Sequence, residues 1–191
     1  MNYKAKMDEI LEKNMTEKGF KLWVGISKIL PNAWDRPTSS TGKFHKKLDG
    51  SVPDISEHTY EMLYALVKLF RMFDYQPKTT DGDTLLLAIA FHDSLKYGQF
   101  GSRKHTDGRH DRDAADMIAF NKETFRKLLT EEQYNMLEEG IRFHSGRWST
   151  DVHNQSSFDW KEYKSSTLII HTLDMLSTAD CLKTDIREVN K

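Results

Sequence analysis

The sequence has a single cysteine, no long apolar run and no excess of charge of either sign. One cysteine, Cys181, excludes an internal disulfide framework and is typical of a reducing compartment. The longest apolar run, LLLAIAF at 85–91, is far too short to cross a bilayer. The opening residues MNYKAKMDEI carry acids where a signal peptide needs an apolar core, so no membrane partner is expected and a cytoplasmic location is predicted. A net charge of -1 gives no electrostatic case for general nucleic-acid binding.

Proline and glycine are also scarce, at four and ten residues, and they gather in a few polar stretches that we expect to be loops. The length of 191 residues, with 38% hydrophobic and 30% charged residues, fits one globular domain. Between the loops, apolar residues recur at helical spacing and no segment alternates as a strand does. The sequence therefore predicts an all-α protein, with helices over 5–30 (two short ones), 56–73, 83–98, 110–129, 130–144 and 168–189. Thr16 is the expected N-cap of the second short helix and Ser56 that of the next, and Thr130 with Gln133 stands in capping-box positions.

Several predicted helices carry a polar, ionisable residue in an apolar context. His92 and Asp93 directly follow the run LLLAIAF, where an unpartnered polar group costs several kcal/mol. The pair must be satisfied by hydrogen bonds or lie against a cation. A lone histidine on an apolar face is usually a hydrogen-bonded core residue. Imidazoles and carboxylates from separate helices that face one interior are, however, what a metal site in a bundle requires, and the candidates are His58, His92, Asp93, His110, His144 and Asp180.

The order of these residues resembles the HD superfamily of metal-dependent phosphohydrolases. The segments that carry the resemblance are, in order along the chain, SEHTYEMLYALVKL, AFHDSLKYG, HDRDAADMI, IRFHSGRW and MLSTADCLK. Together they cover roughly residues 43–186. The lead-in KFHKKLDGSVPDISEHT resembles the opening of members that are often encoded by phages. The resemblance therefore implies the cytoplasm of a bacterial or phage-infected cell.

The resemblance also implies a fold, an HD-domain helical bundle with a metal site in its core. Residues 1–191 would form a single domain, with an HD core at 43–191 and an N-terminal helical extension and loop at 1–42. The extension matches none of the motifs. Its hydrophobic stripe fits either a cap on the domain or the interface of a homo-oligomer.

By the resemblance, His58, His92, Asp93 and Asp180 would be the protein ligands of one divalent ion. In members with two ions, histidines at the positions of His110 and His144 complete a second site, and the Asp of the HD motif bridges both ions. In members with one ion, such histidines contact the substrate phosphate instead. Both roles stay open here. Mixed imidazole and carboxylate ligands suit Mn, Fe, Co, Ni or Zn better than Mg or Ca.

The implied chemistry is attack on phosphorus by a metal-activated water that Asp93 orients. Lys96 lies one helical turn after His92 and would neutralise charge that develops on the phosphoryl group, unless it is a surface lysine. Candidates for substrate binding are weaker, since a solvated basic face or a core-covering tryptophan explains most of them equally well. These candidates are Lys96, Arg109, Arg112, Arg147, Trp148 and His45.

Three functions follow from this interpretation. The first is hydrolysis of a nucleotide or a related small phosphate ester, because a compact, nearly neutral domain suits a compact ligand. The alternative is a phosphodiesterase that acts on cyclic nucleotides or short oligonucleotides. The third is a binding or regulatory module whose metal only stabilises the bundle. An enzyme is favoured over a module because structural metal sites usually close with Cys and His, whereas this set leaves room for water.

Overall fold

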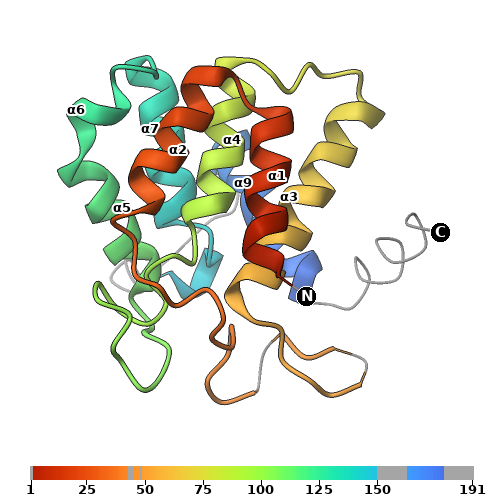
Figure 1. Cartoon of the computed structure of the whole chain (residues 1–191), viewed down its shortest axis with the longest axis vertical. Coiled ribbons are helices and arrows are strands. Elements are labelled where there is room, and N and C mark those ends of the chain that lie inside the picture. The colour runs from red at the N-terminus through yellow and green to blue at the C-terminus, as the bar shows by residue number, and fades with distance from the viewer. Residues whose placement is uncertain (1, 43–44, 48, 150–162, 179–191) are drawn as a thin grey trace.

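The structure, a computed structural model, describes residues 2–42, 45–47, 49–149 and 163–178 (Figure 1). Within these ranges the regular structure is helical and the only β-bridge, between Pro37 and Asp54, is isolated, which confirms the all-α class. The α-helices are α1 (Tyr3–Asn14), α2 (Glu17–Ser27), α3 (Ile55–Met72), α4 (Thr80–Phe91), α5 (His110–Phe120), α6 (Lys122–Phe125), α7 (Glu131–Arg142) and α9 (Ser165–Thr178). A short 3-10 helix, η1, spans Gly146–Trp148.

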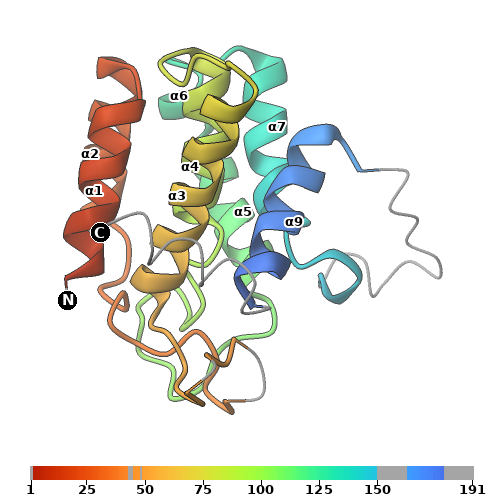
Figure 2. The same cartoon turned by 90° about the vertical axis from the view of Figure 1, so that its right-hand side faces the viewer.

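Helix α4 lies at the centre of the molecule and packs against α1, α2, α3, α7 and α9. Figure 2 shows α1 and α2 as an outer layer on one side of α3 and α4, with α7 and α9 on the other side. Because neighbours surround α4, its C-terminal half from Leu86 to Phe91 is buried on every face, which explains the unbroken apolar run in its sequence. Met7, Leu11 and Trp23 of the N-terminal helices join the same core.

The helix boundaries agree with the sequence at some ends and differ at others. Thr16 caps α2 as expected, and Thr130 with Gln133 forms the predicted capping box of α7. The expected cap of α3 at Ser56 is wrong, because Asp54 accepts the Glu57 backbone N–H at 2.7 Å and starts the helix two residues earlier. The helix expected over 110–129 is interrupted at Asn121, which separates α5 from α6.

The most consequential difference lies at the end of α4. The sequence predicted a helix that continues to Gly98, but α4 ends at Phe91. Beyond it the backbone tightens into successive turns, in which Ser94 N–H donates to Phe91 O and Lys96 N–H to Asp93 O, both at 3.0 Å. Gly98 closes this segment at a φ of 78°, in the left-handed region that glycine tolerates. His92 and Asp93 therefore stand on a helix terminus.

The loops that follow α2 and α4 extend from the same end of the bundle (Figures 1 and 2). Arg36 joins them, since its guanidinium stacks on the Tyr97 ring at 3.5 Å and donates to the Gly101 and Arg103 carbonyl oxygens at 2.9 and 2.8 Å. Ser40 and Thr106 add a hydroxyl contact of 3.1 Å between the loops. The two loops thus form one connected surface below α3 and α4.

Thr16 also links the N-terminal helices to the core. Its hydroxyl donates to Asp83 of α4 at 2.5 Å, and its backbone N–H donates to the other carboxylate oxygen at 2.8 Å. Asp83 is fully buried. Burial raises the pKa of Asp83, although both hydrogen bonds from Thr16 oppose that rise.

We predict that Thr16→Ala lowers the free energy of unfolding by about 2–3 kcal/mol, since it removes a helix cap and leaves a buried acceptor without its donor. Thr130→Ala is the matched control, because it removes a cap from an exposed helix start and should cost only about 1 kcal/mol. Urea denaturation followed by circular dichroism measures both. Equal losses for the two variants would contradict the role of the Thr16–Asp83 contact.

Candidate metal centre

Three histidines of the cluster are oriented by a backbone carbonyl three residues earlier in the chain. The Nδ1 atoms of His92, His110 and His144 lie 2.6, 2.8 and 2.7 Å from the carbonyl oxygens of Ile89, Asp107 and Ile141. A carbonyl oxygen only accepts, so each Nδ1 carries the proton and donates. In the neutral imidazole the Nε2 atom then presents a lone pair, as a metal ligand does.

His58 reaches the same state through a side chain. Its Nδ1 lies 2.8 Å from the Ser177 hydroxyl, and that hydroxyl donates to the Asp174 carbonyl oxygen at 2.8 Å. Because the hydroxyl proton is already committed, Ser177 accepts from Nδ1–H of His58. A partner that fixes the far nitrogen of a ligating histidine is typical of metal sites.

The Nε2 atoms face one another in two close pairs. His58 and His92 are separated by 3.2 Å between Nε2 atoms, and His110 and His144 by 3.3 Å. With the protons on Nδ1, each pair brings two lone pairs together in a buried site, an arrangement that repels unless a positive charge lies beside it. These distances are too short for two neutral acceptors and suit nitrogens that share a cation.

Asp93 lies between the two pairs. Its Oδ1 is 3.1 Å from His110 Nε2 and 3.6 Å from His144 Nε2, while its Oδ2 is 3.7 Å from His58 Nε2 and 3.6 Å from His92 Nε2. Oδ1 is buried and has no hydrogen-bond donor. A buried carboxylate oxygen without a donor is costly. One carboxylate thus presents one oxygen to each histidine pair, as a ligand shared by two ions would.

A further carboxylate joins the His58 side of the cluster. Asp174 of α9 places Oδ1 at 3.1 Å from His58 Nε2. Burial would raise the pKa of Asp174, but its contact with His58 outweighs that effect and holds the pKa well below its usual range. Asp174 is therefore an ionised oxygen donor at the first histidine pair.

Burial favours the neutral imidazole at two of the four bundle histidines, His92 and His110. Burial lowers the pKa of His92 to about 3 and also lowers the pKa of His110. Burial acts in the same direction on His144, but the carboxylates of Asp93 and Asp174 outweigh it and raise the pKa of that residue. For Asp93, burial is opposed by the Lys96 ammonium and the histidines, which hold its pKa well below the ordinary value.

The residues fit a divalent transition metal. The donor atoms form three groups, each within 4.8 Å, which are His58, His92 and Asp93; Asp93, His110 and His144; and His45, His58 and Asp174. Imidazole nitrogen and carboxylate oxygen bind such ions at about 2.0–2.2 Å, and opposed donors around one ion therefore lie about 4 Å apart. Neutral nitrogens, ionised carboxylates and the unsatisfied Asp93 oxygen all suit a cation.

The structure brings together five of the six candidate ligands from the sequence, namely His58, His92, Asp93, His110 and His144. Asp180 lies outside the described residues, so its role stays a prediction. The sequence reasoning missed Asp174, which stands in the apolar stretch LIIHTLDML of α9. Its polar character within that stretch is the same kind of signal that singled out the other candidate ligands.

Lys96 is buried beside Asp93, which contradicts its alternative interpretation as a surface lysine. Its ammonium lies 2.5 Å from Asp93 Oδ2. The tight turns after α4 bring the two side chains together, since they are only three residues apart. A buried lysine is retained where its charge is paired, and here it adds a fixed positive charge next to the histidine cluster.

The candidate substrate residues lie around this cluster at different depths. Arg109 is exposed and directly precedes His110 at the start of α5. Arg112 is also exposed and lies near Asp116 of the same helix. Trp148 is 49% exposed. The side chain of Arg147 lies outside the described residues. His45 packs its ring edge against His58 at 4.6 Å between ring centroids.

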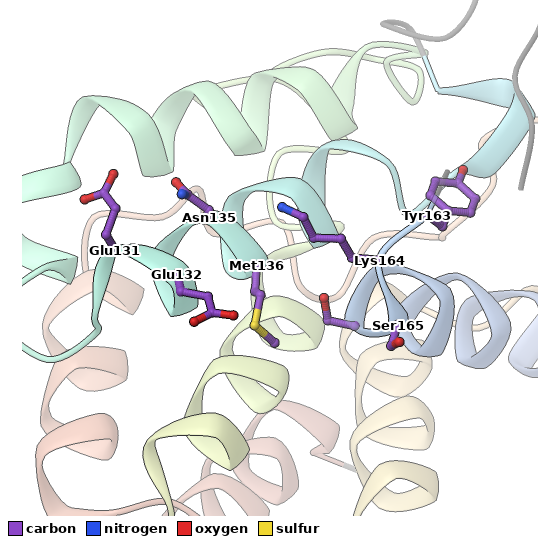
Figure 3. A pocket seen from close by; sticks show the side chains of 8 residues that line it. Glu131, Glu132, Asn135, Met136, Tyr163, Lys164 and Ser165 are labelled. Atoms are coloured by element: carbon purple, nitrogen blue, oxygen red, sulfur yellow. The ribbon is translucent and has the colours of Figure 1, made fainter. Parts of the chain in front are cut away.

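A cavity of about 720 Å³ elsewhere on the molecule lacks comparable chemistry. Figure 3 shows its lining on α7 and the start of α9, including Glu132, Met136 and Lys164. No described histidine lines it.

Among the helices that the structure describes, none is long and apolar enough to span a membrane. No protein-family model matches the chain, and neither a curated protein nor a solved structure is significantly similar to it.

We predict that the metal-free protein loses stability between pH 6.5 and 5. The folded pKa of His92 lies below its ordinary value of 6.5, so the unfolded chain binds the proton first as the pH falls. His92 alone contributes about 1.4 kcal/mol per pH unit below 6.5, and His110 and His45, whose pKa values burial also lowers, add to the loss in the same direction. The pKa of His144 is raised, so this residue changes the free energy of unfolding above pH 6.5. The carboxylates change it only below pH 5.

Urea denaturation in the presence of a chelator, at pH 7, 6 and 5, measures this slope. The variant His92→Gln does not titrate at that position and should give a shallower slope, whatever its absolute stability. A free energy of unfolding that is independent of pH from 7 to 5 would show that His92 is not held neutral.

Proposed function

We propose that the protein is a metal-dependent phosphohydrolase that hydrolyses a nucleotide or a related small phosphate ester with a metal-activated water. The observation that carries the proposal is the Asp93 carboxylate between two pairs of inward-facing histidine Nε2 atoms. The HD-like order of motifs in the sequence supports it independently. The same two observations favour a transition metal such as Mn, Fe, Co, Ni or Zn.

In this proposal the residues hold two ions rather than one. His58, His92 and Asp174 would bind the first ion, His110 and His144 the second, and Asp93 would bridge them. The sharing of Asp93 by two groups of donor atoms favours this role for His110 and His144 over direct contact with substrate phosphate. When bound, such ions lower the pKa of a water molecule and polarise a phosphoryl oxygen.

The other residues act on charge and orientation. Asp93 would accept a hydrogen bond from the attacking water and so orient its lone pair toward phosphorus. Lys96 already lies on Asp93, so its ammonium stabilises negative charge that accumulates at this point during phosphoryl transfer. Arg109, exposed beside His110, can pair with a phosphate oxygen of a bound substrate.

The test is turnover by protein that is purified without chelator and loaded with Mn, Fe or Co. We expect release of phosphate or nucleoside from at least one member of a panel of nucleoside mono- and triphosphates, cyclic nucleotides and short oligonucleotides. The product distinguishes a monoesterase from the alternative phosphodiesterase. No turnover across a metal-loaded panel, by a folded protein, would contradict the proposal.

We predict that Asp93→Asn lowers kcat by at least about 100-fold, as loss of a preorganised charge in an active site does. The asparagine keeps the shape of the side chain and an oxygen for Lys96, but it leaves that buried ammonium without its counter-charge, so we expect a lower Tm together with a circular dichroism spectrum of a folded protein. The control His105→Asn changes an exposed histidine of the neighbouring loop and should leave kcat unchanged.

The same variant separates an enzyme from a module that metal merely stabilises. For a structural metal, the wild-type protein would have no turnover, and both Asp93→Asn and chelation would lower Tm strongly. For a catalytic metal, the wild-type protein turns over substrate, and turnover is lost in Asp93→Asn although the circular dichroism spectrum of the variant remains that of a folded protein.

A further inference from the structure

His45 belongs to the loop between α2 and α3, outside the helical bundle. The ends of this loop are joined by the Pro37–Asp54 bridge, in which Thr38 N–H donates to the Pro53 carbonyl oxygen at 3.0 Å. Next to His45 in the loop, Lys47 forms an ion pair with Glu57 of α3. The described part of the loop is therefore held against the first turn of the helix that carries His58.

The backbone of His45 adopts an unusual conformation. Its φ is 57°, in the left-handed region, and it is one of only two described residues other than glycine with a positive φ. Such a conformation costs energy in an L-residue and persists where surrounding contacts determine it, often at binding sites. The His45 imidazole lies against the His58 ring of the bundle, at 4.6 Å between ring centroids.

The His45 imidazole lies beside the cluster and has an unsatisfied atom. A donor atom of His45 lies within 4.8 Å of donor atoms of both His58 and Asp174. Its Nδ1 is buried and has no hydrogen-bond partner. The four histidines of the bundle site differ in this respect, because the Nδ1 of each is paired with a carbonyl or hydroxyl oxygen. A buried ring nitrogen without a partner indicates a missing ligand.

We propose that His45 is a further ligand of the metal ion held by His58 and Asp174, contributed by the loop and not by the bundle. The inference rests on the metal binding within the proposed function and not on hydrolysis. It concerns the third group of donor atoms, His45, His58 and Asp174, whose oxygen and nitrogen donors come from three separate parts of the chain.

This assignment makes the two ions unequal. Among the described residues, the first ion would have five protein ligands, His45, His58, His92, Asp93 and Asp174, whereas the second would have Asp93, His110 and His144. An ion with six positions then retains at most one open position at the first site, which Asp180 would fill if it binds there, and at most three at the second. The substrate phosphate would therefore bind chiefly to the second ion, beside Arg109, while the first ion is largely closed by protein.

The test compares metal binding by the wild type, His45→Asn and the control His105→Asn, each prepared metal-free. Asparagine accepts the left-handed conformation, so His45→Asn removes the imidazole without adding backbone strain. Co²⁺ is titrated in competition with a chromophoric chelator, which gives the affinity of each site. The visible absorption of bound Co²⁺ reports a change in the number of its ligands.

We expect His45→Asn to weaken one of the two Co²⁺ sites by at least about 10-fold, since even loss of a residue that only supports a ligand costs this much. The Co²⁺ spectrum should change in the same variant. His105→Asn, on an exposed loop residue, should match the wild type in affinity and in spectrum.

Two results would overturn the assignment. Unchanged Co²⁺ affinity and spectrum with a raised KM would make His45 a substrate contact, and unchanged Co²⁺ binding with a lower Tm of the metal-free protein would make it a packing residue. The outcome is separate from that of the proposed function. If His45→Asn weakens Co²⁺ binding but the wild type turns over no substrate, the assignment of His45 as a ligand is supported and the hydrolase is refuted. If the wild type turns over substrate but His45→Asn binds Co²⁺ as the wild type does, only the assignment of His45 is refuted.

Discussion

The arrangement of the central helices depends on one electrostatic constraint, a buried carboxylate surrounded by histidine lone pairs. Asp93 is 1% exposed, and His58 and His92 are fully buried. Charges and lone pairs in such a place are costly unless an opposite charge compensates them. Lys96 supplies one positive charge, on one oxygen of Asp93. The other oxygen faces two nitrogens without a donor, which is why a cation completes the site better than any group of the described chain.

The orientation of the ligands follows from the way the helices end. The last carbonyl groups of a helix have no partner within it. His92 and His144 each use such a carbonyl, of Ile89 and Ile141, to accept from Nδ1. His110 uses a loop carbonyl in the same way at the start of α5. The ends of α4 and α7 therefore also fix the orientation of the His92 and His144 imidazoles.

Metal binding and folding are coupled in such a design. A cluster of close nitrogens and carboxylates repels itself at short range, so an ion that satisfies it contributes to the stability of the bundle even where its role is catalytic. The motif order in the sequence and the geometry of the cluster support the same proposed chemistry by independent routes. The first concerns residue types along the chain, and the second concerns distances between atoms that lie far apart in the sequence.

The sequence alone determined the all-α class, the caps at Thr16 and Thr130, and five of the cluster residues, because helical periodicity and polar residues in apolar runs are local signals. The tertiary structure decided what depends on long-range packing. Motif spacing selected Asp180, whereas the packing of α9 on α3 brings Asp174 to His58. His45 has no apolar run around it, and only the folded loop places its ring on His58. The positions at which helix ends and loops converge in the fold determine which histidine nitrogens face one another. The spacing of these residues along the chain does not encode that arrangement.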